Sequence, residues 1–429
     1  MNLGTVGIAS VILLITLFLK MPVFISILGA AMSYFLIEHN IPSMIFAQQM
    51  TSGISNVTLL AIPFFVAMGV FMNYAGISDR IYDFAAVLTG RMTGGLAQVN
   101  IIVSAIMGGM SGSALADAAM DAKMLIPQME KRGFSRSFSC AVTAFSATVT
   151  PIIPPGIGMI LYGSLANVSI GKLFVSGLGL GILITIVLMI LTAWICKRRG
   201  YVPLRDTRVT FDEFWAAFKR AFLPMMLPLV IIGGIRLGLF TATEAGAVGV
   251  LYAIVLGIIY KELDLKKFLQ GLRETAESTA SIMLIVGAAS VFAWILTREK
   301  VPQSLMAFVV EYIDSKALFL LIVNIFLLII GMFIEGNAAM VILVPLLAPI
   351  AAHYGINEIQ FGMMFIINMA IGSISPPVGT LMFVTCGIAK CKIKDFLVDS
   401  IPYFILFLVI LFLVTYVPFV TTFFVDLIY

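Results

Sequence analysis

Two proline pairs interrupt apolar stretches of the chain, and glycines and hydroxyl-bearing residues surround both. The segments are TPIIPPGIGM at 150–159 and SPPVGTLMF at 375–383. A proline removes a backbone donor and clashes with the preceding helical turn, so each pair should break a helix. Carbonyl groups freed by such breaks coordinate Na⁺ in secondary transporters, and half-helix N-termini face anionic substrate groups. The pattern therefore predicts binding of a cation and an acid.

Acidic residues in apolar surroundings are the next candidates. Asp117 follows Ser113 by four residues on the same helical face, and Glu335 lies in the segment FIEGNAAM. Carboxylates at membrane depth are costly and usually functional. Asp117 and Glu335 could each contact a substrate, coordinate a cation or anchor a turn by a hydrogen bond. Asp121, which is close to Lys123, is expected nearer the cytoplasmic end of its segment.

Three further polar residues could contact an organic acid. Asn337 and Thr380 could hydrogen-bond a hydroxylated substrate. Arg298, at an outer helix end, could pair with a substrate carboxylate or could anchor its helix at the membrane surface. Glu244 follows Thr243 at a helix start, where capping accounts for it.

Composition excludes most other chemistries. The 429 residues are 61% hydrophobic and 11% charged, whereas soluble domains carry about 25% charged residues. The fold class is therefore an all-α polytopic membrane protein, and a net charge of +4 is too small to indicate a nucleic-acid partner. Two histidines and four cysteines without metal-site spacing predict free thiols, no transition-metal site, no cofactor and no enzyme activity.

Apolar stretches divide the chain into membrane segments. They cover 3–19, 23–38, 57–75, 96–128, 135–170, 172–196, 222–238, 243–260, 276–297, 317–351, 358–389 and 397–425. A crossing needs about 20 residues, so 96–128 and 317–351 are too long for one. We interpret both as re-entrant helical hairpins with tips at 108–117 and 333–340; two short complete helices in each is the alternative. The proline pairs make 135–170 and 358–389 broken transmembrane helices.

Basic residues set the orientation. With the N-terminus outside and both hairpins re-entrant, most of the 26 Lys and Arg residues fall inside, Lys20 among them. The exceptions are Lys172, Arg236, Arg298, Lys300 and Lys316. Because no basic residue precedes the first apolar run, it is unlike a signal peptide, and we expect this span to be retained.

An internal repeat relates the two halves. Pro376 lies 222 positions after Pro154, and the same offset places Gly331 on Gly109. The segments 40–50 and 264–274 also correspond, and the amphipathic stripe of the second predicts a helix lying flat on the membrane surface. We divide the chain into a first inverted repeat (1–207), an amphipathic interfacial linker helix (208–222) and a second inverted repeat (223–429).

An inverted pseudo-twofold axis would bring both hairpin tips and both helix breaks together near the membrane midplane. Irregular backbone at that depth is tolerated only where it faces protein or lines a wet cavity. The repeat thus predicts a transporter binding site. A pair of proline kinks used only for packing is the alternative.

Several segments resemble one known family. LLAIPFFVAMG (59–69), SGSALAD (111–117), TPIIPPGIGMI (150–160), GLFTATEAGAVG (238–249), FGMMFIINMAIGSISPPVGT (361–380) and PYFILFLVILFLV (402–414) resemble the large membrane subunit of tripartite ATP-independent periplasmic (TRAP) transporters. The resemblance implies an elevator-type carrier of the ion transporter superfamily in a bacterial inner membrane, with Na⁺ as coupling ion. It also implies a small four-helix membrane subunit and a periplasmic substrate-binding protein as partners. Its substrates would be organic acids such as sialic acid, other sugar acids or C4-dicarboxylates.

The resemblance also assigns residues. The sodium-binding set is Ser111, Gly112, Ser113, Thr148, Thr150, Pro154, Gly336, Ser373, Ser375 and Pro376. With the residues above, the candidate substrate-binding set is Ser113, Asp117, Glu335, Asn337, Thr380 and Arg298. The alternative function is a stand-alone Na⁺- or H⁺-coupled carboxylate permease of the same superfamily. A channel or a membrane enzyme is a second alternative, from a different class of protein.

Overall fold

The computed structural model describes residues 3–19 and 21–429, so Lys20, predicted to be cytoplasmic, lies outside the described residues. The described residues are largely helical and form no β-strand. The first half contains α1 (Leu3–Phe18), α2 (Val23–Ile37), α3 (Met44–Ile54), η1 (Val57–Leu60), α4 (Ala61–Tyr74), α5 (Ile77–Thr89), α6 (Gly95–Ser111), α7 (Ala114–Met124), α8 (Ile126–Lys131), α9 (Arg136–Ala147), α10 (Ile157–Ala166) and α11 (Ile170–Arg199). The second contains α12 (Phe211–Arg236), α13 (Ala242–Ile259), α14 (Leu265–Arg298), α15 (Val301–Tyr312), α16 (Lys316–Gly331), α17 (Gly336–His353), α18 (Glu358–Gly372), α19 (Thr380–Ala389), α20 (Ile393–Tyr416) and α21 (Phe419–Ile428).

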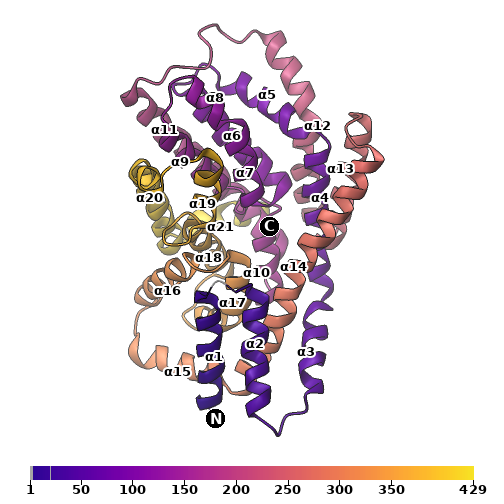
Figure 1. Ribbon diagram of the computed structural model, residues 1–429, viewed down its shortest axis with the longest axis vertical. Coiled ribbons are helices and arrows are strands. Elements are labelled where there is room, and N and C mark those ends of the chain that lie inside the picture. The colour runs from indigo at the N-terminus through magenta and orange to yellow at the C-terminus, as the bar shows by residue number, and fades with distance from the viewer. Residues whose placement is uncertain (1–2, 20) are drawn as a thin grey trace.

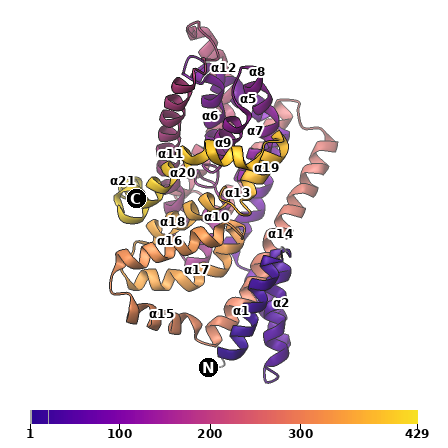
Figure 2. The same cartoon turned by 60° about the vertical axis from the view of Figure 1, so that its left-hand side comes forward.

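The molecule is elongated, and its two ends are built from different helices. Helices α5 and α8 lie at one end, whereas α1, α3 and α15 lie at the other (Figures 1 and 2). Among the described helices, seven are long and apolar enough to cross a membrane. The prediction of an all-helical polytopic membrane protein is therefore confirmed.

Both proline pairs interrupt the helices, as predicted. The first break separates α9 from α10, and the second separates α18 from α19. Each contains a cis peptide bond between its two prolines. The chain nevertheless stays inside the protein at the first break, where Thr148 and Thr150 are completely buried.

Both over-long apolar stretches fold as two helices joined by a tight turn. The first turn is Gly112 and Ser113, where Gly112 has a φ of 63° that favours glycine. The Ser113 hydroxyl caps α7 by accepting from the Ala116 N–H at 3.4 Å. In the second turn, the Glu335 carboxylate caps α17 by accepting from the Ala338 N–H at 3.1 Å.

Two of the predicted helix boundaries are wrong. The linker helix expected at 208–222 does not end there, because α12 continues without interruption to Arg236. The surface helix expected at 264–274 is likewise the beginning of α14, which runs for 34 residues to Arg298. The amphipathic pattern of each segment gives way to an apolar one within the same helix, and α12 continues through two separated prolines, Pro224 and Pro228.

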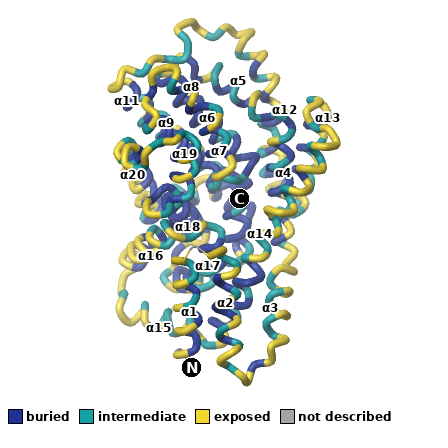
Figure 3. Tube along the Cα trace, in the orientation of Figure 1, coloured by how far each residue is buried: buried dark blue, intermediate teal, exposed yellow. Residues whose placement is uncertain are grey.

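The buried residues concentrate where the two halves interlock (Figure 3). Helix α7 packs against α19, the helix that follows the second break, and α17 packs against α10, which follows the first. Nearly every residue of α9 and all but one of α18 are buried. These exchanged contacts place the turn of each hairpin beside the break of the other half.

Candidate functional site

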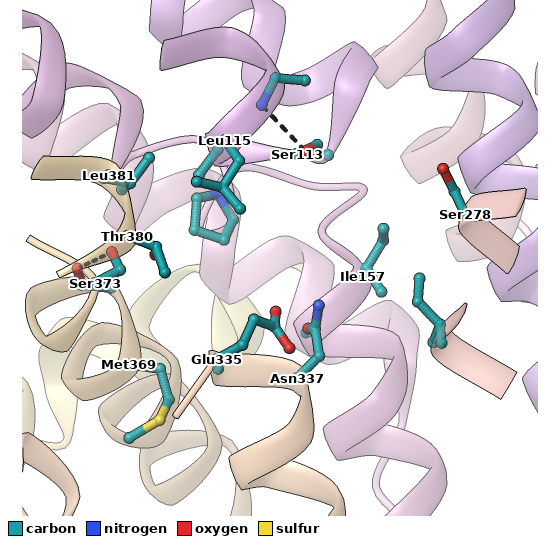
Figure 4. Close-up of a pocket in the computed structure, with 18 of the residues that line it drawn as sticks. Ser113, Leu115, Ile157, Ser278, Glu335, Asn337, Met369, Ser373, Thr380 and Leu381 are labelled. Carbon is teal, nitrogen blue, oxygen red and sulfur yellow. Dashed lines mark hydrogen bonds between the residues drawn. The ribbon is translucent and has the colours of Figure 1, made fainter. Parts of the chain in front are cut away.

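A cavity of about 450 Å³ lies where the hairpin turns and helix breaks meet. Its walls include residues of both turns, such as Ser113 and Asn337, and residues next to both breaks, such as Gly158 and Thr380. Figure 4 shows Glu335 and Asn337 on one side of this space, with Thr380 and Leu115 across from them. Four segments that are far apart in sequence therefore share one cavity.

Helices α4 and α14 close the cavity with polar residues that sequence reasoning missed. Asn73, Glu274, Glu277 and Ser278 line it. The Glu274 carboxylate accepts a hydrogen bond from the Tyr74 hydroxyl at 2.5 Å, and Glu277 pairs with Arg273 at 2.7 Å. The spacing of Glu274, Glu277 and Ser278 puts them on one helical face, and this face was the available signal. The predicted boundary between a surface helix at 264–274 and an apolar span at 276–297 divides this face, because Glu274 falls in the first segment and Glu277 and Ser278 in the second.

The predicted sodium-binding residues divide into two groups. Ser111, Gly112, Ser113, Gly336 and Ser373 line the cavity. The other five do not line it; they are Thr148, Thr150, Pro154, Ser375 and Pro376. Two of these five have hydroxyl groups that donate to backbone carbonyls of the preceding helical turn. Thr148 donates to the Phe145 carbonyl at 2.6 Å, and Ser375 donates to the Ile371 carbonyl at 2.7 Å.

Asp117 connects the first hairpin turn to the first helix break. Its Oδ2 atom accepts hydrogen bonds from the Ser111 hydroxyl at 2.8 Å and from the Thr150 hydroxyl at 2.9 Å. Asp117 is 1% exposed and does not line the cavity. Of its three predicted roles, the geometry therefore supports anchoring of the turn; direct substrate contact would require a different arrangement.

Four of the predicted substrate residues line the cavity, and two do not. Ser113, Glu335, Asn337 and Thr380 belong to its lining. Arg298 is the last residue of α14, 16 positions beyond Ile282, the last residue of that helix in the lining. At 1.5 Å rise per residue this is roughly 24 Å along the helix. Arg298 instead stacks on Trp294, so the anchoring alternative describes it and the substrate assignment is not supported.

Asp121 lies three residues before Met124, the last residue of α7, and is fully buried between helices. Its Oδ2 atom accepts from the Ser104 hydroxyl of α6 at 2.9 Å. The neighbouring Lys123 is exposed, because residues two positions apart point to different sides of a helix.

Close backbone approach holds the breaks against the hairpins. A Cβ added to Gly108 would lie 2.8 Å from the Thr150 Cα, and one added to Gly372 would lie 2.5 Å from the Gly331 backbone. Both distances are too short for real atoms, so only glycine permits these contacts. The helices α6 and α16 therefore directly support the irregular segments.

The fold is similar to that of solved structures. The structure is similar to the Alcanivorax borkumensis YdaH transporter, with a TM-score of 0.61, 16% identity and 86% of each chain covered. It also resembles Neisseria gonorrhoeae MtrF, described with a class of antimetabolite efflux pumps, with a TM-score of 0.53 and 13% identity over 86% of this chain and 82% of that one. At these identities, the likeness concerns the fold alone.

Sequence comparison gives the family. Residues 10–420 match the family described as "Tripartite ATP-independent periplasmic transporter, DctM component". The chain belongs to this family of TRAP transporter large permeases, as its motifs predicted.

Relatives in this family are named for different substrates. The chain is 40% identical to the sialic acid TRAP transporter large permease protein SiaM of Vibrio cholerae, over 94% of each chain. It is 36% identical to the sialic acid permease protein SiaT of Haemophilus influenzae, over 98% of this chain and 68% of the relative. It is 37% identical to the C4-dicarboxylate large permease protein DctM of Pseudomonas aeruginosa, over 84% of each. These relatives are transporter permeases, so the prediction that the chain is not an enzyme is confirmed.

Proposed function

We propose that this chain is the large permease subunit of a Na⁺-coupled importer of an organic acid. The observation that carries the proposal is the shared cavity, in which two hairpin turns and the flanks of two helix breaks face one another. Freed backbone carbonyls at such breaks are the ligands by which secondary transporters hold Na⁺. Ser111, Ser113 and Ser373 add hydroxyl oxygens in the same place.

The proposal includes an inverted repeat and an elevator-type movement. Helices α9 and α18 begin at Arg136 and Glu358, and α7 and α17 begin at Ala114 and Gly336, each pair at the 222-residue offset of the proline pairs. The exchanged packing of α7 on α19 and of α17 on α10 is what a pseudo-twofold axis produces. Under this scheme the hairpins and broken helices would move as one body against α4 and α14, carrying the cavity between them.

An organic acid with hydroxyl groups fits the lining. Asn337 offers an amide, and Ser113 and Thr380 offer hydroxyls. Helix α7 begins at the cavity, where its first backbone N–H groups favour a carboxylate, whereas the Glu335 carboxylate already caps α17. Among the described lining residues there is no Lys or Arg, so a bound Na⁺ would supply the positive charge. The relatives' names favour a sialic acid, another sugar acid or a C4-dicarboxylate.

The family supports two partners and a location. We infer that a small four-helix membrane subunit and a periplasmic substrate-binding protein complete the transporter, and that it works in a bacterial inner membrane. Exposed apolar side chains on α1, α2 and α3 include Leu14, Leu36 and Met44. They form a surface that the small subunit or lipid could cover.

Uptake by reconstituted protein tests the function. The chain is reconstituted in liposomes with the small subunit and the binding protein, and radiolabelled sialic acid, a C4-dicarboxylate and a sugar acid are supplied with and without a Na⁺ gradient. We expect saturable uptake of one class that requires Na⁺ and falls when Ser113, Asn337 or Ser375 is replaced by Leu. Uptake that needs no binding protein would favour the stand-alone permease. Unsaturable flux without counterflow would indicate a channel.

A further inference from the structure

A second polar cluster lies between α6, α7 and α9, one helical turn beyond Asp117 and outside the cavity lining. At its centre is Asp121, which is completely buried. Ser104 donates to the Oδ2 atom of Asp121, but Oδ1 has no hydrogen-bond partner among the described residues. Buried carboxylate oxygens are normally paired, so this oxygen needs an explanation.

The serine hydroxyls beside Asp121 each lie within hydrogen-bond distance of two other oxygens. The Ser104 hydroxyl is 2.9 Å from Asp121 and 3.0 Å from the Ser146 hydroxyl. Ser146 is in turn 2.8 Å from the Asn100 Oδ1 atom and 3.1 Å from the Thr143 carbonyl. Each hydroxyl carries a single hydrogen, so the two serines cannot serve all four contacts at once. Both hydroxyl oxygens also keep lone pairs that a cation could share with the Asp121 carboxylate.

No basic side chain balances the charge. Asp117 lies four residues before Asp121 on the same face of α7, so two carboxylates are buried close together. Neither takes part in any ion pair between described residues. Two buried carboxylates cannot both stay ionised without a compensating positive charge.

We propose that Asp121 is the carboxylate ligand of a buried sodium ion held between α6, α7 and α9. The Asp121 Oδ1 atom and the hydroxyl oxygens of Ser104 and Ser146 would bind it, and Asp117 would add the second negative charge one turn away. An oxygen-only set suits a hard cation, and two carboxylates fall short of the several that a calcium site uses. This ion lies apart from the hairpin-turn residues assigned above. A role of this ion in driving substrate transport rests on the proposed function, whereas the binding of the ion does not.

Thermal unfolding of the purified chain in detergent tests the site directly. NaCl is varied against choline chloride at constant ionic strength, and the Na⁺ dependence of the Tm is measured. We expect Asp121→Asn to reduce the apparent Na⁺ affinity of this response at least about tenfold. Its Tm in choline should not fall, because an uncompensated buried charge has been removed. Asp83→Asn, at an exposed acid on α5, is the matched control and should leave the response unchanged.

A second variant keeps the test decisive if the first does not fold. Ser104→Ala retains the Asp121 charge and removes one neutral ligand, so it should weaken the Na⁺ response severalfold. An undiminished Na⁺ response in either variant would overturn the proposal. So would an Asp121→Asn protein that keeps the response to Na⁺ and loses only a response to pH, because that result assigns a proton to the carboxyl.

The same measurements separate this site from the proposed function. If reconstituted wild-type protein takes up substrate without needing Na⁺, the coupling proposal fails while the site stands, provided that Asp121→Asn loses its Na⁺ response. If uptake needs Na⁺ and Asp121→Asn retains the full Tm response, the function stands and this site fails.

Discussion

The two hairpin regions share an architecture but bury different polar groups. In the first, the helices α6, α7 and α9 enclose Asp117 and Asp121. In the second, the positions at the 222-residue offset are Ala339 and Leu343, and the buried polar groups include the amides of Asn324 and Asn368. Asn368 donates to the Asn324 Oδ1 atom at 2.6 Å, and Asn324 donates to the Thr415 hydroxyl at 2.9 Å.

This difference separates two ways of supporting an irregular backbone. Neutral amides supply both donors and acceptors, so Asn368 and Asn324 join α18, α16 and α20 without a charged group, although the Asn368 Oδ1 atom has no hydrogen-bond partner among the described residues. Carboxylates accept only, and buried ones need hydroxyl donors and a positive charge. Under the proposal above, the first region would respond to a cation, whereas the second, without a buried carboxylate at the corresponding positions, would be a fixed support.

Replacing Asp117 should have the largest effect. Asp117→Ala leaves the Ser111 and Thr150 hydroxyls without their charged acceptor, and hydrogen bonds to charged groups contribute about 1.5–3 kcal/mol each. We expect loss of most uptake and a clearly lower Tm. Asp117→Asn keeps an acceptor oxygen, so its uptake and its Tm should lie between those of the alanine variant and the wild type. Equal uptake by the alanine variant and the wild type would contradict the anchoring role.

Crowding the helix breaks should be the next most damaging change. Gly372→Ala pushes a methyl group into the Gly331 backbone, and Gly108→Ala does the same to the Thr150 backbone at a slightly longer distance. Both should lower uptake and Tm, with Gly372→Ala the more severe. Gly387→Ala in α19 is the control, because no atom lies within 4 Å of the added Cβ. A harmless Gly372→Ala would show that the second break is not held by α16.

The neutral network should affect stability without affecting Na⁺. Asn324→Leu breaks its hydrogen bonds with Asn368 and Thr415, and an unsatisfied buried partner costs about 1–3 kcal/mol. The Tm should fall by the same amount in NaCl and in choline chloride. A selective loss of the Na⁺ response would remove the distinction between the two hairpin regions.

Changing Arg298 should have the smallest effect. Its guanidinium group stacks on Trp294 away from the cavity, and surface substitutions usually change free energies by about 0.5 kcal/mol or less. Arg298→Gln should therefore change the KM for uptake by no more than about twofold. Asn337→Leu, measured beside it, should raise KM strongly because Asn337 lines the cavity. The reverse order of effects would restore Arg298 as a substrate residue.

Local chemistry made several features predictable from the residues alone. A proline pair must interrupt a helix wherever it lies, and a Gly-Ser or Glu-Gly turn between apolar stretches ends one helix and caps the next. The breaks and the turns could therefore be anticipated, and the internal repeat predicted that their residues meet at one cavity. The fusion of 208–222 and 264–274 with the following spans could not, because an amphipathic segment looks the same whether its helix stops or continues.

Tertiary structure alone decided the environment of each polar side chain. The sequence determined that Asp117, Asp121, Glu274 and Arg298 exist near apolar segments, but their types and spacing do not say which neighbours surround them. Packing of α6 and α9 around α7 buried Asp121, and the length of α14 carried Arg298 away from the cavity. A helix interruption is a property of neighbouring backbone atoms, whereas burial and charge balance depend on segments that meet only after the chain has folded.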